Sequence, residues 1–206
     1  MISRFLICTA HSALIASMIC LVTITGCHHY DETGSFPAAN PSDCLPNLTL
    51  RNQDGQNVNL SSFKGNYVLV NFIYTGCSGT CPMLTSKMSI VEKKLAPELG
   101  RKVRLVSVTL DPEHDTSAQL LKYAREHGAN DADWIFLTGA PVEIDDYLVI
   151  FKIKRTREAD GSIEHVTTSF LLGPDGRQIR QYDGIAVTPS TMADDIDRAL
   201  SHASNG

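Results

Sequence analysis

The chain lacks any long run of positive charge. Its 206 residues include 18 Lys and Arg against 23 Asp and Glu, which gives a formal net charge of -5. The longest basic runs are pairs such as Lys93-Lys94 and Arg101-Lys102. Proteins that bind nucleic acids gather positive charge into a patch or stripe that contacts phosphates. We therefore exclude nucleic acid from the partners that this sequence predicts.

Acidic residues are absent from the first 26 positions. Arg4 supplies a positive charge there, and an apolar stretch runs from Phe5 to Ile24. A charged start, an apolar core and a small-residue end together form the pattern of an export signal. A membrane-spanning helix is the competing interpretation, because about 20 apolar residues can cross a bilayer. Both interpretations place the remaining chain outside the cytoplasm and next to a membrane.

The segment Ile24-Thr25-Gly26-Cys27 resembles the bacterial lipobox, whose cysteine receives a lipid and becomes the mature N-terminus. It predicts a lipoprotein signal peptide over residues 1–26 and lipidation of Cys27. The alternative is an uncleaved anchor that happens to end in a cysteine. Residues 27–44 are rich in turn-forming residues and have no apolar period, which predicts a flexible tether. A domain over residues 45–206 would then face the periplasm or the outer cell surface.

The cysteines do not form the even, widely spaced set that is typical of structural disulfides. The chain has six of them: Cys8, Cys20, Cys27, Cys44, Cys77 and Cys81. The first three belong to the predicted signal and lipidation site, which leaves three. Cys77 and Cys81 lie close together in the sequence, so we interpret them as a chemical site. Cys44 is either an idle thiol or a site of intermolecular oxidation.

Strand and helix patterns alternate after residue 45. An Asp54-Gly55 turn between two short β-rich segments predicts an N-terminal β-hairpin. Residues 154–164 are polar with an Asp160-Gly161 turn, and we expect this segment to move. The alternation predicts an α/β domain with a central sheet flanked by helices. The predicted strands are 47–50, 57–60, 67–74, 103–110, 133–137, 166–172 and 178–182. The predicted helices are 116–127, 142–151, 189–199 and one that starts at Pro82 and stops before Pro97 or by Gly100.

The junction between a buried strand and a helix carries the most informative chemistry. Cys77 follows the strand, and Cys81 opens the helix in front of Pro82. The amides and partial positive charge of a helix N-terminus favour a thiolate, which is both a nucleophile and a soft metal ligand. Redox thioredoxins separate their cysteines by two residues, whereas three separate them here. Two thiolates with an imidazole suit Cu(I), and the chain lacks the second close ligand pair of a structural zinc site.

Several ordered motifs resemble the Sco/SenC family of copper proteins. The first is the C-x-x-x-C-P signature that ends the segment Val68–Pro82. The others follow in the family's order across residues 45–200: Ser107–Thr116 with Asp111-Pro112, Leu137–Gly139, Glu164-His165, Phe170–Leu172 and Pro174–Gly176. The resemblance implies a thioredoxin-like fold with a central mixed sheet.

The same resemblance implies a copper ion bound by Cys77, Cys81 and His165. It also implies a role as a copper chaperone for the dinuclear copper site of cytochrome c oxidase or for another copper protein. Asp111 would lie near the metal loop. The chain departs from the family at Ser78, where proline is usual, and at Gly76, where histidine is usual. These changes loosen the loop without removing a ligand.

A membrane-tethered thiol–disulfide oxidoreductase is the alternative function, and whether the protein is an enzyme stays open. It would use Cys77 and Cys81 as a redox pair that forms a reversible disulfide, and it would not need His165. The chain lacks the proline that thioredoxin-type reductases carry just before the strand at Phe170, which weakens this interpretation. Met83 and Met88 lie at helical spacing, which predicts core packing rather than thioether ligands.

Overall fold

The computed structural model describes residues 43–129 and 133–204. The predicted signal peptide, Cys27 and nearly all of the predicted tether lie outside these residues. Within the described part, no helix has the length and apolar character that a membrane crossing requires.

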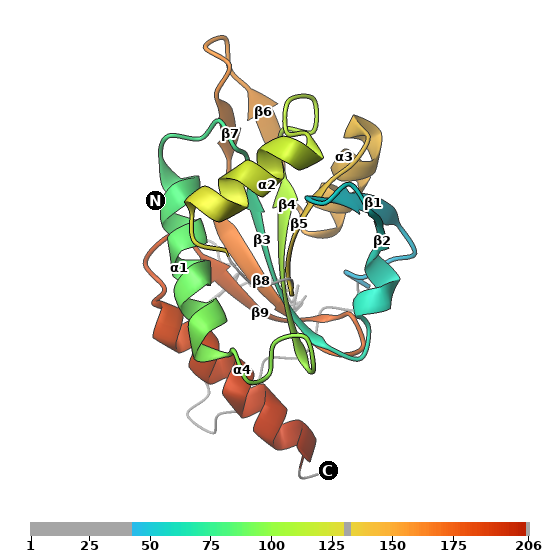
Figure 1. Ribbon diagram of the computed structural model, residues 1–206, viewed down its shortest axis with the longest axis vertical. Coiled ribbons are helices and arrows are strands. Elements are labelled where there is room, and N and C mark those ends of the chain that lie inside the picture. The colour runs from blue at the N-terminus through green and yellow to red at the C-terminus, as the bar shows by residue number, and fades with distance from the viewer. Residues whose placement is uncertain (1–42, 130–132, 205–206) are drawn as a thin grey trace, which may run out of the picture. The chain divides into compact units, whose positions relative to one another are not determined.

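A mixed sheet of seven strands forms the centre of the domain (Figure 1). The strand order is β2-β1-β5-β4-β3-β8-β9. β3 pairs with β4 and β4 with β5 in parallel, and the other neighbours are antiparallel. The strands are β1 (Thr49–Asn52), β2 (Asn57–Asn59), β3 (Tyr67–Ile73), β4 (Val103–Thr109), β5 (Trp134–Thr138), β8 (Thr168–Leu172) and β9 (Gln178–Asp183).

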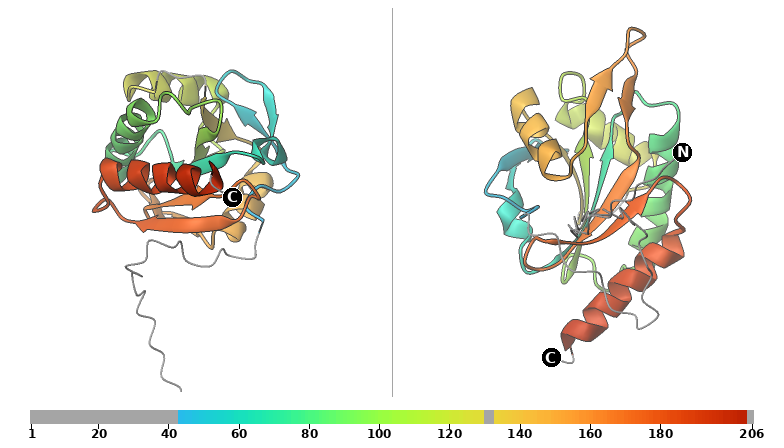
Figure 2. Two further views of the ribbon diagram at one scale, coloured as in Figure 1. Left: turned by 90° about the horizontal axis from the view of Figure 1, so that it is seen from below. Right: turned by 180° about the vertical axis from the view of Figure 1, so that it is seen from behind.

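Four helices cover the two faces of the sheet. α1 (Thr80–Lys94), α2 (Ser117–Glu126) and α4 (Pro189–Ser204) lie on one face, and α3 (Pro141–Ile150) lies on the other (Figure 2). The parallel strand pairs require crossover connections, which α1 and α2 provide. β3 is a run of seven residues of which six are buried, because both faces of a central strand are covered.

An aromatic cluster joins α3 to the sheet. The ring of Phe72 on β3 lies 5.1 Å from that of Phe151 and 6.1 Å from that of Phe170, between ring centroids. Both neighbours meet it edge to face, an arrangement that aromatic pairs prefer. Phe72 is fully buried. The cluster therefore packs α3 against β3, the strand that leads to the cysteines.

A second, two-stranded sheet extends from the domain. It consists of β6 (Arg155–Arg157) and β7 (Ile163–His165), joined by a turn in which Gly161 has a φ of 83°. Only glycine adopts that conformation at low cost. The structure therefore contains the predicted Asp160-Gly161 turn, and it adds two strands on either side of it that the sequence analysis did not predict. The strands are too short and polar to be recognised by apolar alternation.

The remaining elements agree with the sequence in class and order. The predicted α/β class, the mixed sheet flanked by helices and the N-terminal β-hairpin are confirmed. A 3-10 helix, η1 (Leu60–Phe63), follows β2, and α1 begins at Thr80, so Cys81 lies within its first turn. Cys44 is fully buried, and its amide donates to the Gly176 carbonyl at 2.8 Å.

Candidate metal centre

Cys77 lies in the turn that follows β3, and its thiol is half-buried. Its amide donates to the Tyr74 carbonyl at 3.2 Å, which bends the chain back toward α1. Burial raises the pKa of the Cys77 thiol, but hydrogen bonds from the amides of Cys81 and Gly79 and from the side chains of Cys81 and Tyr74 together lower it by more. The net pKa lies below the ordinary value, so Cys77 ionises readily.

Cys81 is the second residue of α1 and only 1% exposed. Burial raises the pKa of its thiol far above the ordinary range. The expectation that the helix N-terminus favours both thiolates was therefore wrong for Cys81, because desolvation outweighs the hydrogen bond with the Tyr74 backbone that lowers its pKa. None of the three described cysteines forms a disulfide. Cys81 thus holds its proton until a cation or a bond to sulfur replaces it.

His165 ends β7 and lies beside Cys81. Its Nε2 is 3.7 Å from the Cys81 Sγ, and its Nδ1 is 3.2 Å from the Val166 carbonyl oxygen. In the tautomer whose Nδ1–H donates to that carbonyl, Nε2 presents its lone pair to Cys81. Burial lowers the pKa of the imidazole, so the ring stays neutral. The fold therefore brings Cys81 and His165 into contact although they lie on different elements.

Tyr74 connects the two sides of this site, and the sequence reasoning missed it. Its hydroxyl oxygen accepts a hydrogen bond from the Ile163 amide at 3.3 Å, and its ring meets the His165 ring edge-on at 6.0 Å between centroids. A hydrogen bond from the Tyr74 side chain also lowers the pKa of Cys77. The sequence could have pointed to Tyr74 only through its position as the last residue of the apolar run before Thr75.

Asp115 holds the cysteine loop to the end of β4. It is fully buried and accepts hydrogen bonds from the Thr75 amide at 3.1 Å, the Thr75 hydroxyl at 2.6 Å and the Thr109 hydroxyl at 2.5 Å. Burial raises the pKa of this carboxyl group. The part of the Asp-Pro motif that contacts the cysteine loop is therefore Asp115.

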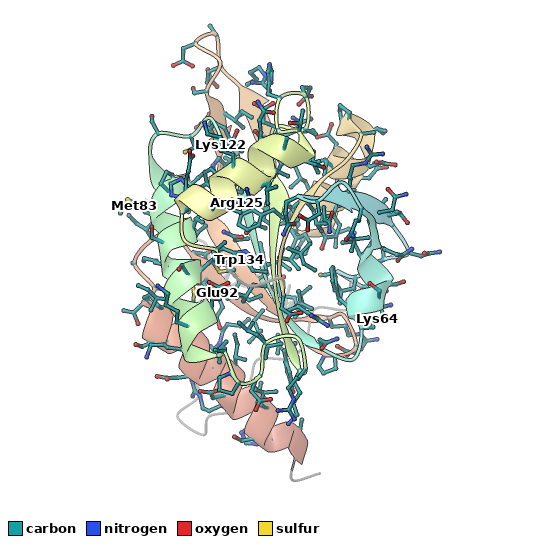
Figure 3. The ribbon with its side chains drawn as sticks, viewed as in Figure 1. Lys64, Met83, Glu92, Lys122, Arg125 and Trp134 are labelled. Carbon is teal, nitrogen blue, oxygen red and sulfur yellow. The ribbon has the colours of Figure 1, made fainter. Side chains whose placement is uncertain are left out.

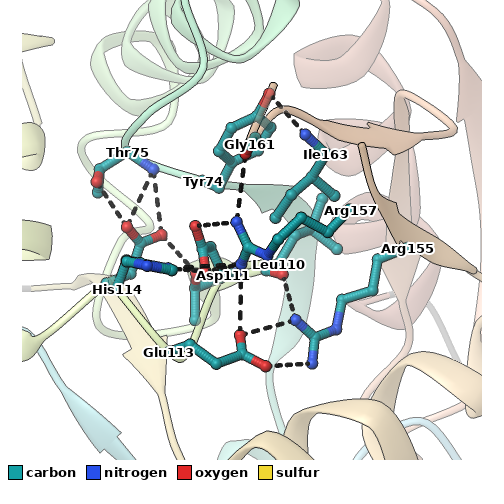
Figure 4. Close-up of polar contacts among 12 residues, drawn as sticks. Tyr74, Thr75, Leu110, Asp111, Glu113, His114, Arg155, Arg157, Gly161 and Ile163 are labelled. Atoms are coloured by element: carbon teal, nitrogen blue, oxygen red, sulfur yellow. Dashed lines mark hydrogen bonds and ion pairs between the residues drawn. The ribbon is translucent and has the colours of Figure 1, made fainter. Parts of the chain in front are cut away.

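Asp111, the residue expected near the metal loop, faces a different neighbour. It pairs with Arg157 and accepts from His114 Nδ1 at 2.8 Å (Figure 4). Arg157 and His114 hold the pKa of this carboxyl below its usual range although burial opposes them. Asp111 thus acts within an ion-pair network between the β4–α2 loop and the β6–β7 hairpin.

The methionines of α1 divide between core and surface. Met88 is fully buried, as its spacing predicts. Met83 is 49% exposed and points outward from α1 (Figure 3). The expectation of core packing was therefore wrong for Met83, which lies on the outer side of the helix. Nothing places its sulfur against the cysteines.

The Cys81–His165 pair fits a shared metal ion. Ligand bonds of about 2.3 Å to sulfur and 2.05 Å to nitrogen at a tetrahedral angle separate the two atoms by about 3.6 Å. The observed separation is 3.7 Å. Two sulfurs and one imidazole form a soft donor set that suits Cu(I). Among the described residues, however, no three His, Cys, Asp or Glu side chains are already grouped to hold an ion. The third proposed ligand, Cys77, interacts with the Cys81 side chain, and this interaction lowers the pKa of Cys77 and raises that of Cys81.

Comparison with known proteins gives consistent results. Residues 37–201 match the SCO1/SenC family. The chain is 39% identical over 160 residues to the SCO1 protein homolog of Bacillus subtilis (strain 168), covering 76% of this chain and 81% of that protein.

Solved structures that are similar to this domain include three Sco proteins. A SCO1/SenC family lipoprotein from Bacillus anthracis str. Ames has a TM-score of 0.73 at 25% identity, covering 81% of this chain and 99% of that chain. ScoI of Bradyrhizobium japonicum with copper bound has a TM-score of 0.65 at 28% identity, with coverages of 74% and 97%. BsSco, described with a disulfide switch and as a member of the Sco family of cytochrome c oxidase assembly proteins, has a TM-score of 0.66 at 34% identity, with coverages of 78% and 95%. The predicted thioredoxin-like fold is confirmed.

Proposed function

The chain belongs to the SCO1/SenC family, and on that premise we propose that it binds a copper ion as cargo for assembly of the dinuclear copper site of cytochrome c oxidase. The proposed ligands are Cys77, Cys81 and His165. The observation that carries this proposal is the 3.7 Å contact between the Cys81 Sγ and the His165 Nε2. ScoI, a relative with the same fold, was solved with copper bound.

Each ligand contributes a different property to this site. Cys77 has a lowered pKa, so it offers a thiolate first. Cys81 has a raised pKa and releases its proton only when a cation compensates its buried charge. His165 is neutral and needs no proton release. Copper binding therefore releases protons, and affinity rises with pH.

The recipient that this chemistry fits is a protein whose own copper site is built from soft ligands. We propose the copper-site subunit of cytochrome c oxidase, because a similar protein, BsSco, is described as a member of the Sco family of cytochrome c oxidase assembly proteins. The half-buried Cys77 is the accessible member of the pair, so the cargo would leave from its side.

We also propose that residues 1–26 form a lipoprotein signal, that Cys27 is lipidated and that residues 27–44 tether the domain. A lipid-modified cysteine would hold residues 45–206 at the outer side of a membrane. The similar protein from Bacillus anthracis is described as a lipoprotein.

A thiol–disulfide oxidoreductase is the second candidate, and one observation favours it. Cys77 is accessible with a lowered pKa, whereas Cys81 is buried with a raised pKa. An ionised attacking thiol paired with a protected resolving thiol is the arrangement that thiol exchange uses. Both functions can share one site, since reduced target cysteines are the form that accepts copper.

Anaerobic titration of the reduced protein with Cu(I), in competition with a chelator, tests the copper proposal. Residues that hydrogen-bond to a metal ligand typically contribute about 10- to 100-fold to metal affinity. Loss of a ligand itself should therefore weaken binding at least about 100-fold. We expect this loss in Cys77→Ser, Cys81→Ser and His165→Ala. The Cys44→Ser and His202→Ala variants serve as controls and should bind like the unmodified protein.

The result that would overturn the copper proposal is unchanged affinity in both Cys77→Ser and His165→Ala. Stoichiometric reduction of a disulfide-containing partner peptide by His165→Ala, together with no copper binding by the unmodified protein, would assign the oxidoreductase function instead.

A further inference from the structure

His165 lies directly opposite Arg155 in the β6–β7 hairpin. The register of the two strands pairs Arg155 with His165, Thr156 with Glu164 and Arg157 with Ile163. The hairpin forms a sheet of its own and does not pair with the seven-stranded sheet. The position of His165 therefore depends on what attaches this hairpin to the rest of the domain.

The Arg155 guanidinium makes five hydrogen bonds outside the hairpin, and Figure 4 shows those that reach Leu110 and Glu113. Its Nη1 donates to the Leu110 carbonyl and to Glu113 Oε2, both at 3.0 Å, and its Nη2 donates to Glu113 Oε1 at 3.2 Å. Asp145 on α3 accepts from Nε at 2.7 Å and from Nη2 at 3.3 Å. An arginine side chain has five N–H groups in all, a number that these five bonds match.

These contacts attach the hairpin to two separate parts of the domain. Glu113 and Leu110 belong to the β4–α2 loop, whereas Asp145 belongs to α3. The Arg155 side chain is only 15% exposed, in contrast to 37% for Arg157. Planar guanidinium–carboxylate pairs with two parallel hydrogen bonds fix direction as well as distance. Attachment of the hairpin therefore depends on the planar shape of the guanidinium group as well as on its charge.

We propose that Arg155 is a positioning residue for copper binding: it anchors β6 to the β4–α2 loop and α3, and through the β6–β7 pairing it holds His165 beside Cys81. This inference rests on the proposed function. On β7 itself, the amide of Ile163 donates to the Tyr74 hydroxyl at 3.3 Å. That single neutral hydrogen bond is weaker than charge-assisted bonds.

A double-mutant cycle with Cu(I) tests this proposal. The four proteins are the unmodified chain, Arg155→Ala, His165→Ala and the double variant. We expect Arg155→Ala to weaken Cu(I) binding roughly 10- to 100-fold while His165 is present, and to have little effect once His165 is absent. A residue with only a structural role would weaken binding by the same factor in both backgrounds, and that result would overturn the proposal.

Two further variants separate position from charge. Arg155→Lys keeps the charge without the planar fork, so we expect it to bind copper closer to Arg155→Ala than to the unmodified protein. Arg177→Ala removes an exposed arginine from the β8–β9 turn and should bind normally. Full recovery of affinity by Arg155→Lys would overturn the geometric argument. Glu113 and Asp145 are 41% and 53% exposed, so their charges remain solvated in Arg155→Ala and the variant should fold.

Amide hydrogen exchange without copper provides a readout that is independent of the proposed ligands. In Arg155→Ala we expect the amides of residues 155–165 to exchange faster than in the unmodified protein. The exchange rates of amides within β3 and β4 should not change. Unchanged amide exchange at residues 155–165 would show that Arg155 does not anchor the hairpin. Faster hairpin exchange in Arg155→Ala, together with normal copper binding by His165→Ala, would mean that His165 is not a ligand. Arg155 would then still anchor the hairpin.

Discussion

The Cys81 Sγ and the His165 Nε2 lie 3.7 Å apart although 84 positions separate the residues in sequence. The contact keeps the imidazole against a buried thiol, and burial lowers the pKa of His165 below the ordinary value of about 6.5. A base with a lowered pKa contributes stability that is present above its unfolded pKa and is lost as pH falls through its folded pKa.

We therefore expect the unmodified protein to lose more stability than His165→Gln as the pH falls from about 7.5 to 5. Urea unfolding followed by circular dichroism at several pH values measures this difference. His202→Gln, which changes an exposed histidine of α4, is the control and should follow the unmodified protein. Parallel stability curves for the unmodified protein and His165→Gln would contradict the burial of the neutral ring.

The two site cysteines should differ strongly in reactivity. In the reduced, copper-free protein, iodoacetamide should modify Cys77 first, with a rate midpoint lower than that of an ordinary exposed cysteine. Cys81 should react only after unfolding, because it is buried and its pKa is raised. Peptide mass spectrometry over a pH series measures both rates.

Cys44 provides an internal control for this experiment. It is fully buried, and burial raises the pKa of its thiol to about 11, so it should resist modification in the folded protein. Equal rates for Cys77 and Cys81 at neutral pH would contradict the division between an ionised and a protonated thiol.

Tyr74→Phe should separate the hydroxyl group from the ring. The variant keeps the edge-on contact with His165 but loses the bond from the Ile163 amide, at a cost of about 0.5–1.5 kcal/mol in the free energy of unfolding. It should also raise the pKa of Cys77, because the Tyr74 hydrogen bond lowers it. Chemical denaturation and the pH midpoint of Cys77 alkylation measure the two effects.

Tyr67→Phe is the matched control for Tyr74→Phe. Its hydroxyl donates to the Ala199 carbonyl at 2.9 Å, on α4, so its loss should cost similar stability without moving the alkylation midpoint of Cys77. An unchanged midpoint in Tyr74→Phe would show that the hydroxyl does not influence the thiol.

Phe72→Ala should be among the most destabilising core substitutions. The ring is buried between Phe151 and Phe170, and removing a buried phenylalanine typically costs about 3–5 kcal/mol. Urea unfolding measures the loss, and Phe72→Leu, which retains most of the volume, should lose less. A cost below about 1.5 kcal/mol would mean that the aromatic cluster closes over the cavity.

The main sheet could be predicted because its signals are local. The seven residues of β3 form a continuous apolar run, and Asp54-Gly55 specifies the turn of the β1–β2 hairpin. The β6–β7 hairpin escaped prediction because its three-residue strands carry polar side chains. Its conformation depends on ion pairs with residues of the β4–α2 loop and α3, which no local pattern encodes.

The sequence by itself determined the class of the domain, the Cys77–Cys81 junction and, through ordered motifs, the family. It did not determine which thiol is protonated, because desolvation depends on the side chains that surround Cys81 in space. Nor did it reveal Tyr74, Asp115 or Arg155 as neighbours of the site. Those contacts join distant segments, and only tertiary packing brings their atoms within hydrogen-bonding distance.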